Sequence, residues 1–348
     1  MGPACLRVFA VVLCAVLIAG RAAAQDSVEA FYKGKQVNVI VGSSAGGGYD
    51  TYARLLARYF GSHIPGNPAI VAQNMTGAGS NRAAGYVYSV APKDGTVIAA
   101  IFPGAILQPL LGEVAVQHDP NKFIYLGSAN SDIYVCFVRA DAPVKTFQDV
   151  LRQELIVGAS NEGATTRDLP MLMNNVLGTK FRIVTGYAGS REITLALERG
   201  EVQGVCGIGW TGIATIHPEW LSSGTIKVLA QLSLKAHPDL TRLGAPLVID
   251  LAKSAEDRRV MELVLSQSIF GRPFVLPPGV PSERAAALRT AFMQAMQDKK
   301  LLAEAEKMKL DVDPLSGEGL QTVVKHLYAT PAHLIERARQ ALVAKPQQ

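Results

Sequence analysis

The chain has 348 residues, more than one typical domain holds, and this length suits two domains. Its 34 basic and 29 acidic residues leave a formal net charge of +5. The basic residues are scattered, without runs or interleaved aromatic residues, which argues against binding to nucleic acid. With four cysteines and no Cys-x-x-Cys or His-x-x-x-His spacing, the sequence supports no structural zinc site, and we expect neither a metal nor a cofactor.

Residues 1–24 are predicted to be a secretory signal peptide. Arg7 provides the basic n-region, Val8 to Ala19 form an apolar run, and Ala22-Ala23-Ala24 supply the small residues of a cleavage site. The run is too short to span a membrane. We therefore expect an exported protein whose mature chain begins at Gln25.

The mature chain keeps two cysteines, Cys136 and Cys206, because Cys5 and Cys14 leave with the signal peptide. An exported compartment permits one disulfide between them. Both lie in apolar, strand-like segments, however, where buried free thiols are also common. The sequence leaves these two states open.

The most informative stretch is a glycine-rich turn between a strand and a helix. Val37 to Val41 is rich in β-branched residues, and apolar positions between Tyr52 and Phe60 recur with the spacing of a half-buried helix. The turn between them, Gly42 to Gly48, lets a ligand approach backbone N–H groups because glycine has no Cβ. The helix directs its unpaired N–H groups and positive dipole end at the same place, so a carboxylate is the expected occupant.

The strand-turn-helix pattern then recurs along the chain. Further small-residue turns, expected after strands, are residues 74–80, 102–104, 160–166 and 186–190. Repeated units of this kind predict α/β lobes with mainly parallel sheets flanked by helices, and in such sheets ligands lie beyond the carboxyl ends of the strands. After the extended segment Phe270 to Leu276, only helices are predicted, which would return the chain to the first lobe.

These patterns predict two lobes hinged by crossing strands. We expect the first lobe to comprise residues 25–138 and 251–348, and the second to comprise 139–250. The expected ligand-binding residues are those of the turns and the aromatic residues beside them: Ser43, Ser44, Ala45, Gly46, Gly47, Gly48, Tyr49, Asp50, Asn74, Thr76, Gly77, Ala78, Gly79, Ser80, Phe102, Ser160, Asn161, Gly163, Ala164, Thr165, Thr166, Tyr187, Ser190 and Trp210.

Two other interpretations of the first turn, a hydrolase nucleophile elbow and a phosphate-binding loop, have less support than a carboxylate site. Gly42 to Gly46 matches the Gly-x-Ser-x-Gly elbow of serine hydrolases, with Ser44 as nucleophile, but helical periodicity begins only near Asp50 and no histidine stands out as a base. No Gly-Lys-Ser/Thr follows the glycines, which argues against a phosphate-binding loop. For Asp50 we favour a role in fixing the turn as a cap or dipole partner over direct contact with a ligand.

Taken together, the motifs resemble the Bug family, the periplasmic solute-binding proteins of tripartite tricarboxylate transporters. In chain order these are residues 46–54 (Gly-Gly-Gly-Tyr-Asp-Thr-Tyr-Ala-Arg), 74–81, 91–95 (Ala-Pro-Lys-Asp-Gly), 186–190 (Gly-Tyr-Ala-Gly-Ser) and 276–281 (Leu-Pro-Pro-Gly-Val-Pro). The resemblance implies a type II periplasmic-binding-protein fold whose lobes close on a small carboxylate in the periplasm. It also implies delivery to integral membrane permease subunits by a monomeric binding protein that performs no chemistry.

The chain departs from the family pattern in its cleft. Gln203 stands where the family usually has an acidic residue, and Ser43-Ser44-Ala45 replaces a segment where proline is usual. The identity of the carboxylate is therefore not carried over. A ligand sensor that signals to a membrane kinase, rather than a transport protein, is also compatible with this sequence.

Overall fold

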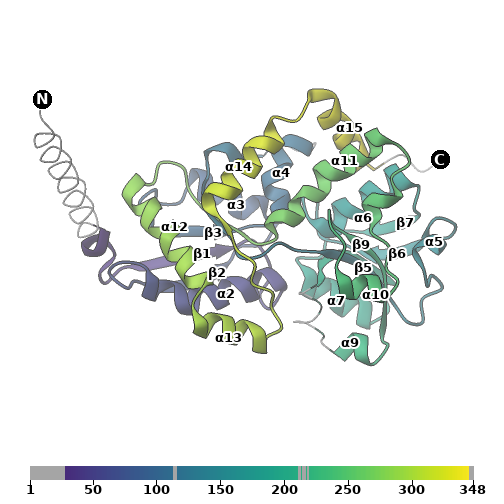
Figure 1. Ribbon diagram of the computed structural model, residues 1–348, viewed down its shortest axis with the longest axis horizontal. Helices are drawn as coiled ribbons and strands as arrows, with labels where there is room; N and C mark the ends of the chain where they lie inside the picture. The colour runs from purple at the N-terminus through teal and green to yellow at the C-terminus, as the bar shows by residue number, and fades with distance from the viewer. Residues whose placement is uncertain (1–27, 113–115, 211–212, 214–216, 218, 345–348) are drawn as a thin grey trace, which may run out of the picture.

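The computed structural model describes residues 28–112, 116–210, 213, 217 and 219–344. The predicted signal peptide lies outside these residues. The described chain forms two α/β lobes, each built on its own sheet, which lie side by side in Figure 1.

The sheet of the first lobe has six strands in the order β11-β4-β10-β3-β1-β2. β1, β2 and β3 pair in parallel, whereas β10 runs antiparallel to both β3 and β4, and β11 runs antiparallel to β4. The strands are β1 (Gln36–Val41), β2 (Ala69–Asn74), β3 (Val97–Ala100), β4 (Ile124–Ser128), β10 (Pro273–Leu276) and β11 (Leu315–Ser316).

Helices cover both faces of this sheet. Along β1, Val37, Val39 and Val41 share a core with α2 and α12, whereas Ile40 shares the opposite core with α3 and α4. This alternation follows from the two-residue period of a strand. The helices of the lobe are α2 (Gly48–Phe60), α3 (Asn81–Ser89), α4 (Pro103–Leu111), α12 (Ser282–Met296), α13 (Lys299–Lys307) and α14 (Gly317–Tyr328).

The sheet of the second lobe has five strands in the order β7-β6-β8-β5-β9. β6, β7 and β8 pair in parallel, and β5 lies antiparallel between β8 and β9. The strands are β5 (Tyr134–Arg139), β6 (Leu155–Gly158), β7 (Phe181–Val184), β8 (Gly204–Gly209) and β9 (Ile226–Leu232), and the helices are α5 (Phe147–Val150), α6 (Thr165–Leu177), α7 (Ser190–Glu198), α9 (Glu219–Ser222) and α10 (Pro238–Arg242).

Two helices connect the lobes. α11 (Ala255–Leu265) and α15 (Ala332–Leu342) pack against each other and against α6 of the second lobe, and α15 also contacts α4 of the first. Figure 1 shows this pair above α6. The backbone itself passes between the sheets twice, at residues 129–133 and at residues 233–272.

The predicted two-lobed α/β fold is confirmed, with differences in detail. Each sheet is mixed rather than mainly parallel, because β5, β9, β10 and β4 pair antiparallel. β5 belongs to the second sheet although the predicted lobe boundary lay at residue 138. Within residues 251–348, α11 contacts α6 of the second lobe, and α15 contacts both α6 and α4 of the first lobe.

Short or poorly patterned elements were missed by the sequence prediction. β4 and α11 were not predicted, and α4 was read only as a turn at residues 102–104. The prediction that only helices follow β10 was wrong, because β11 adds a two-residue edge strand. An element of two residues is too short to show any period.

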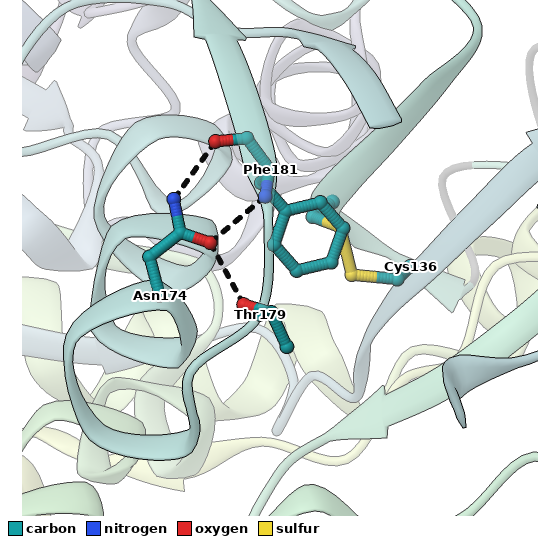
Figure 2. The surroundings of a disulfide bond; sticks show 5 residues. Cys136, Asn174, Thr179 and Phe181 are labelled. Carbon is teal, nitrogen blue, oxygen red and sulfur yellow. Dashed lines mark hydrogen bonds between the residues drawn. A yellow bond between two sulfur atoms is a disulfide. The ribbon is translucent and has the colours of Figure 1, made fainter. Parts of the chain in front are cut away.

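The two remaining cysteines form a disulfide that joins β5 to β8. Cys136 and Cys206 are directly paired in the antiparallel register and are buried. In Figure 2 the Phe181 ring lies beside this disulfide, and Asn174 holds β7 in place by bonding both backbone groups of Phe181. The bridge closes a loop of 70 residues, which in a chain-entropy description stabilises the fold by about 4 kcal/mol.

Candidate functional site

A partly enclosed cavity lies between the two lobes. It forms where β1, β3, β6 and β8 end, as expected for ligand sites beyond the carboxyl ends of parallel strands. The residues that line it are Ser43, Gly48, Tyr49, Phe102, Tyr134, Ser160, Ala164, Thr165, Thr166, Ser190, Gly207, Ile208, Gly209 and Arg272.

Four helices begin at this cavity, two from each lobe. Gly48 and Tyr49 open α2, Phe102 precedes α4, Thr165 opens α6 and Ser190 opens α7. None of the four helices has a side chain that caps its first backbone N–H groups. These N–H groups and the positive dipole ends are therefore directed at one place, an arrangement that attracts an anion.

The first glycine-rich turn is held by Asp50, which is buried. Its carboxylate accepts hydrogen bonds from the Gly46 N–H (2.8 Å), from Arg54 (2.8 Å) and from the Asn74 amide (2.8 Å), and Asn74 also donates to the Ser43 carbonyl (2.9 Å). Burial tends to raise the pKa of Asp50, but these hydrogen bonds outweigh it and hold the pKa below its usual range. Asp50 thus has the turn-fixing contacts that we favoured for it.

We call the side of the cavity lined by Tyr49, Tyr134 and Arg272 its base, and there Arg272 forms an ion pair with Asp132 that joins the two crossing segments. Arg272 Nη1 donates to Asp132 Oδ2 at 2.5 Å, and both side chains are almost fully buried, with exposures of 3% and 1%. The segments are further tied by backbone hydrogen bonds from Asp132 to Ser268 (2.8 Å) and from Gly271 to Asn130 (3.0 Å). Burial raises the pKa of Asp132, and the Arg272 guanidinium opposes that rise.

Aromatic rings surround the Arg272 guanidinium. Its central carbon lies 4.2 Å from the ring centroid of Tyr49 and 5.1 Å from that of Tyr52, and the Tyr49 ring in turn packs against Phe102 at 4.4 Å. Burial raises the pKa of Tyr49 to about 12 even though Arg272 lies beside it. The phenol is therefore neutral at physiological pH and can donate a hydrogen bond.

The lobes touch along the rim of the cavity. Ser44 Oγ donates to Glu192 across the cleft (2.9 Å), and Gln108 donates to Glu162 (2.7 Å). The backbones approach even more closely at Gly104, where an added Cβ would lie 1.5 Å from the Gly163 carbonyl oxygen. Glycine at 104 is thus required for the lobes to meet in this way.

Ser44 does not have the surroundings of a hydrolase nucleophile. Its hydroxyl donates to Glu192, and within the described ranges no histidine forms a hydrogen bond with it. Two of the described histidines bond to other groups: His63 to Asp298, and His118 to the Ala105 carbonyl. A serine triad needs a base bonded to the nucleophile, and this geometry lacks it.

Nine of the predicted site residues line the cavity, namely Ser43, Gly48, Tyr49, Phe102, Ser160, Ala164, Thr165, Thr166 and Ser190. The other predicted residues are not part of its lining: Ser44, Ala45, Gly46, Gly47, Asp50, Asn74, Thr76, Gly77, Ala78, Gly79, Ser80, Asn161, Gly163, Tyr187 and Trp210. Several of these instead hold the turns or join the lobes. Tyr187 and Trp210 pack against the second-lobe core.

Five lining residues were not predicted: Tyr134, Gly207, Ile208, Gly209 and Arg272. The first four lie in β5 and β8, whose apolar composition predicts buried core strands and gives no sign of a binding site. Arg272 did carry a signal, because a lone arginine between Gly271 and Pro273 interrupts an otherwise apolar extended segment. Arginine is rarely buried unless it is paired or functional.

Within the described residues, no cluster of three or more His, Cys, Asp and Glu side chains could hold a metal ion. Likewise, none of the helices in that part of the chain is long and apolar enough to cross a bilayer.

Solved structures with the same fold are periplasmic binding proteins. The periplasmic binding protein BugD superposes with a TM-score of 0.72 and 21% identity, over 89% of this chain and 98% of that one. An R. palustris protein solved with adipate gives 0.69 and 22%, over 88% and 97%, and MatC from Rhodopseudomonas palustris with bound malate gives 0.68 and 20%, over 89% and 99%. These likenesses confirm the predicted two-lobed fold, and BugD among them agrees with the resemblance to the Bug family.

Comparison of the sequence alone gives fewer relatives than comparison of the structure. No protein-family model matches the chain. A curated relative from Agrobacterium vitis, described as a UPF0065 protein in the TAR-I ttuE-ttuC' intergenic region, is 27% identical over 216 residues. That alignment covers 58% of this chain and 57% of the relative.

Proposed function

We propose that this chain is a periplasmic solute-binding protein of the Bug family, which captures a small organic carboxylate between its lobes. The observation that carries the proposal is the meeting of four uncapped helix N-termini at one partly enclosed cavity between the lobes. Such N–H groups form charge-assisted hydrogen bonds to a carboxylate, and these are strong where water is excluded.

The two crossing segments support binding by opening and closing. Residues 129–133 and 233–272 are the backbone connections between the sheets. Rotation about them would separate the two lobes and break the hydrogen bond between Ser44 and Glu192. Hinge closure of two lobes around a ligand is a common way to trap a solute and release it later. Catalysis is not part of the proposal.

The fold neighbours support the choice of ligand class and of compartment. BugD is a periplasmic binding protein, and the two R. palustris proteins were solved with adipate and with malate, both of which are carboxylates. By this analogy the chain is exported through its predicted signal peptide and acts in the periplasm. It would deliver its ligand, as a monomer, to integral permease subunits of a tripartite tricarboxylate transporter.

A thermal-shift screen of residues 25–348 against aliphatic, hydroxy and aromatic carboxylates tests the proposal, with each acid placed beside its methyl ester. Binding to the folded state raises the melting temperature with ligand concentration. We expect some acids to stabilise the protein while their esters do not, because an ester lacks the charge that the helix N-termini attract. Equal stabilisation by acid and ester would contradict the anion-binding cleft.

A further inference from the structure

Three buried side chains at the base of the cavity have polar atoms without partners. Tyr49, Tyr134 and Arg272 all line the cavity. Within the described residues, the hydroxyls of Tyr49 and Tyr134 and the Nε of Arg272 form no hydrogen bond of ordinary length and angle, and each of these atoms is buried. The two phenols nevertheless lie close enough to each other, and Tyr49 to the Arg272 guanidinium, to interact weakly. Buried polar groups are normally paired, so a cluster of three unpaired groups around one cavity points to a ligand.

The chemistry of this cluster is that of hydrogen-bond donors. The Arg272 Nε–H can only donate, and the two phenols are protonated because burial raises the pKa of both Tyr49 and Tyr134. Their natural partner is an oxygen that accepts several hydrogen bonds. A carbonyl, an amide oxygen and a carboxylate all meet that requirement, and charge decides among them.

The net charge at this base is zero. Arg272 is the one charged side chain among the described residues that line the cavity, and its charge is balanced by Asp132 at 2.5 Å. A carboxylate placed here would be a buried charge without a counter-ion, next to another carboxylate. Leaving a buried charge uncompensated is strongly unfavourable, whereas a neutral oxygen carries no such penalty.

We infer that the cavity selects a monocarboxylate whose second polar group is an uncharged oxygen acceptor, rather than a dicarboxylate. The carboxylate occupies the helix N-termini, and the neutral acceptor meets Tyr49, Tyr134 and Arg272. This inference rests on the proposed function. It separates the chain from fold neighbours that were solved with adipate or malate, which are diacids.

Matched pairs of half-amides and diacids test the inference on the unmodified protein. Malonamate, succinamate and glutaramate have nearly the same shape as malonate, succinate and glutarate, but each carries one charge fewer. Isothermal titration should give a dissociation constant at least about tenfold lower for the half-amide at the chain length that binds best. A diacid that binds as tightly as its half-amide, or more tightly, would overturn the inference.

A charge-removing variant sharpens the test. Asp132→Asn keeps the shape of the side chain but frees the charge of Arg272, so the preference should shift toward the diacid by about tenfold or more. Asp257→Asn is the matched control, because it removes a carboxylate that pairs with Arg337 between α11 and α15 instead. If Asp132→Asn folds and its selectivity equals that of Asp257→Asn, the charge argument is wrong.

The outcomes distinguish this inference from the proposed function. If no carboxylate of either kind binds, the proposed function itself fails. If diacids bind best, the protein is a carboxylate-binding protein and only the inference about its second polar group fails. Should Asp132→Asn not fold, the comparison on the unmodified protein decides alone.

Discussion

Helices at the cleft and helices elsewhere begin in different ways. α11, α13 and α14 start with Ser254, Asp298 and Ser316, whose side chains accept hydrogen bonds from the first turn at 3.0, 2.8 and 3.2 Å. α2, α4, α6 and α7 start at the cavity without such a cap. Three helices that do not line the cavity also lack such a cap: α3, which follows a short 3-10 turn at Ala78–Ser80, and α12 and α15, which follow prolines.

The difference indicates that the unpaired N–H groups of helix N-termini are satisfied in two ways, by a capping side chain or by a ligand. A helix N-terminus leaves backbone N–H groups unpaired, and a nearby oxygen must satisfy them. At α11, α13 and α14, away from the cleft, the chain supplies that oxygen itself. At the cleft it supplies none from a capping side chain, so the donors remain available to a ligand that arrives when the lobes close.

The largest expected effect comes from preventing that closure. In Gly104→Ala the new Cβ would collide with the Gly163 carbonyl, a backbone atom that cannot rotate away. Overpacking of this kind costs about 1–3 kcal/mol, which corresponds to roughly a 5- to 150-fold higher Kd for the carboxylate that binds best. Isothermal titration measures the Kd. Small-angle scattering with ligand present should give Gly104→Ala a larger radius of gyration than the unsubstituted protein.

Gly85→Ala is the control for that variant. An added Cβ at Gly85 meets nothing within 4 Å, so the substitution should leave Kd unchanged. It should raise stability slightly, since alanine in a helix is favoured over glycine by about 0.5–1 kcal/mol. Unchanged affinity in Gly104→Ala as well would show that closure does not bring these backbones together.

Asp50→Asn tests how far the first turn depends on its internal carboxylate. The variant weakens the bonds from Gly46 and Arg54, and we expect a loss of about 1–3 kcal/mol in the free energy of unfolding at pH 7. The folded pKa of Asp50 is lowered, so its contribution to stability is present above the unfolded pKa of about 3.9 and is lost as the pH falls through the folded pKa. Urea unfolding at several pH values measures this.

The difference in free energy of unfolding between the unsubstituted protein and Asp50→Asn should therefore be constant above about pH 5 and should shrink below about pH 4. Asp141→Asn removes an exposed carboxylate that pairs with Arg139, and it should change stability little at any pH. A difference for Asp50→Asn that does not depend on pH would mean that the carboxylate charge is not what holds the turn.

The smallest expected effects come from exchanging caps between the two groups of helices. Ala164→Ser gives α6 a capping oxygen at the cavity, which should raise stability by about 1 kcal/mol and weaken carboxylate binding several-fold, because the new hydroxyl competes for the same N–H groups. Ser254→Ala removes the cap of α11 and should lower stability by about 1 kcal/mol while leaving Kd unchanged. If both variants changed Kd equally, cleft caps would have no special role.

Much of the fold and part of the site could be predicted from local patterns. The strand ending at Val41, the turn to Gly48 and the helix to Phe60 follow from β-branched residues, glycines and helical spacing, all of which act between near neighbours. The same local reasoning found the turns at residues 160–166 and 186–190, and with them most of the helix starts at the cavity.

Tertiary structure alone decided what joins the two halves. Arg272 and Asp132 are 140 residues apart, and only the return of the chain through residues 233–272 places them together beneath the cavity. The pairing of Cys136 with Cys206 likewise depends on β5 lying beside β8. Sequence periodicity reports which face of an element is buried, but not which distant element covers it, and at this cleft the distant element also sets the charge that a ligand meets.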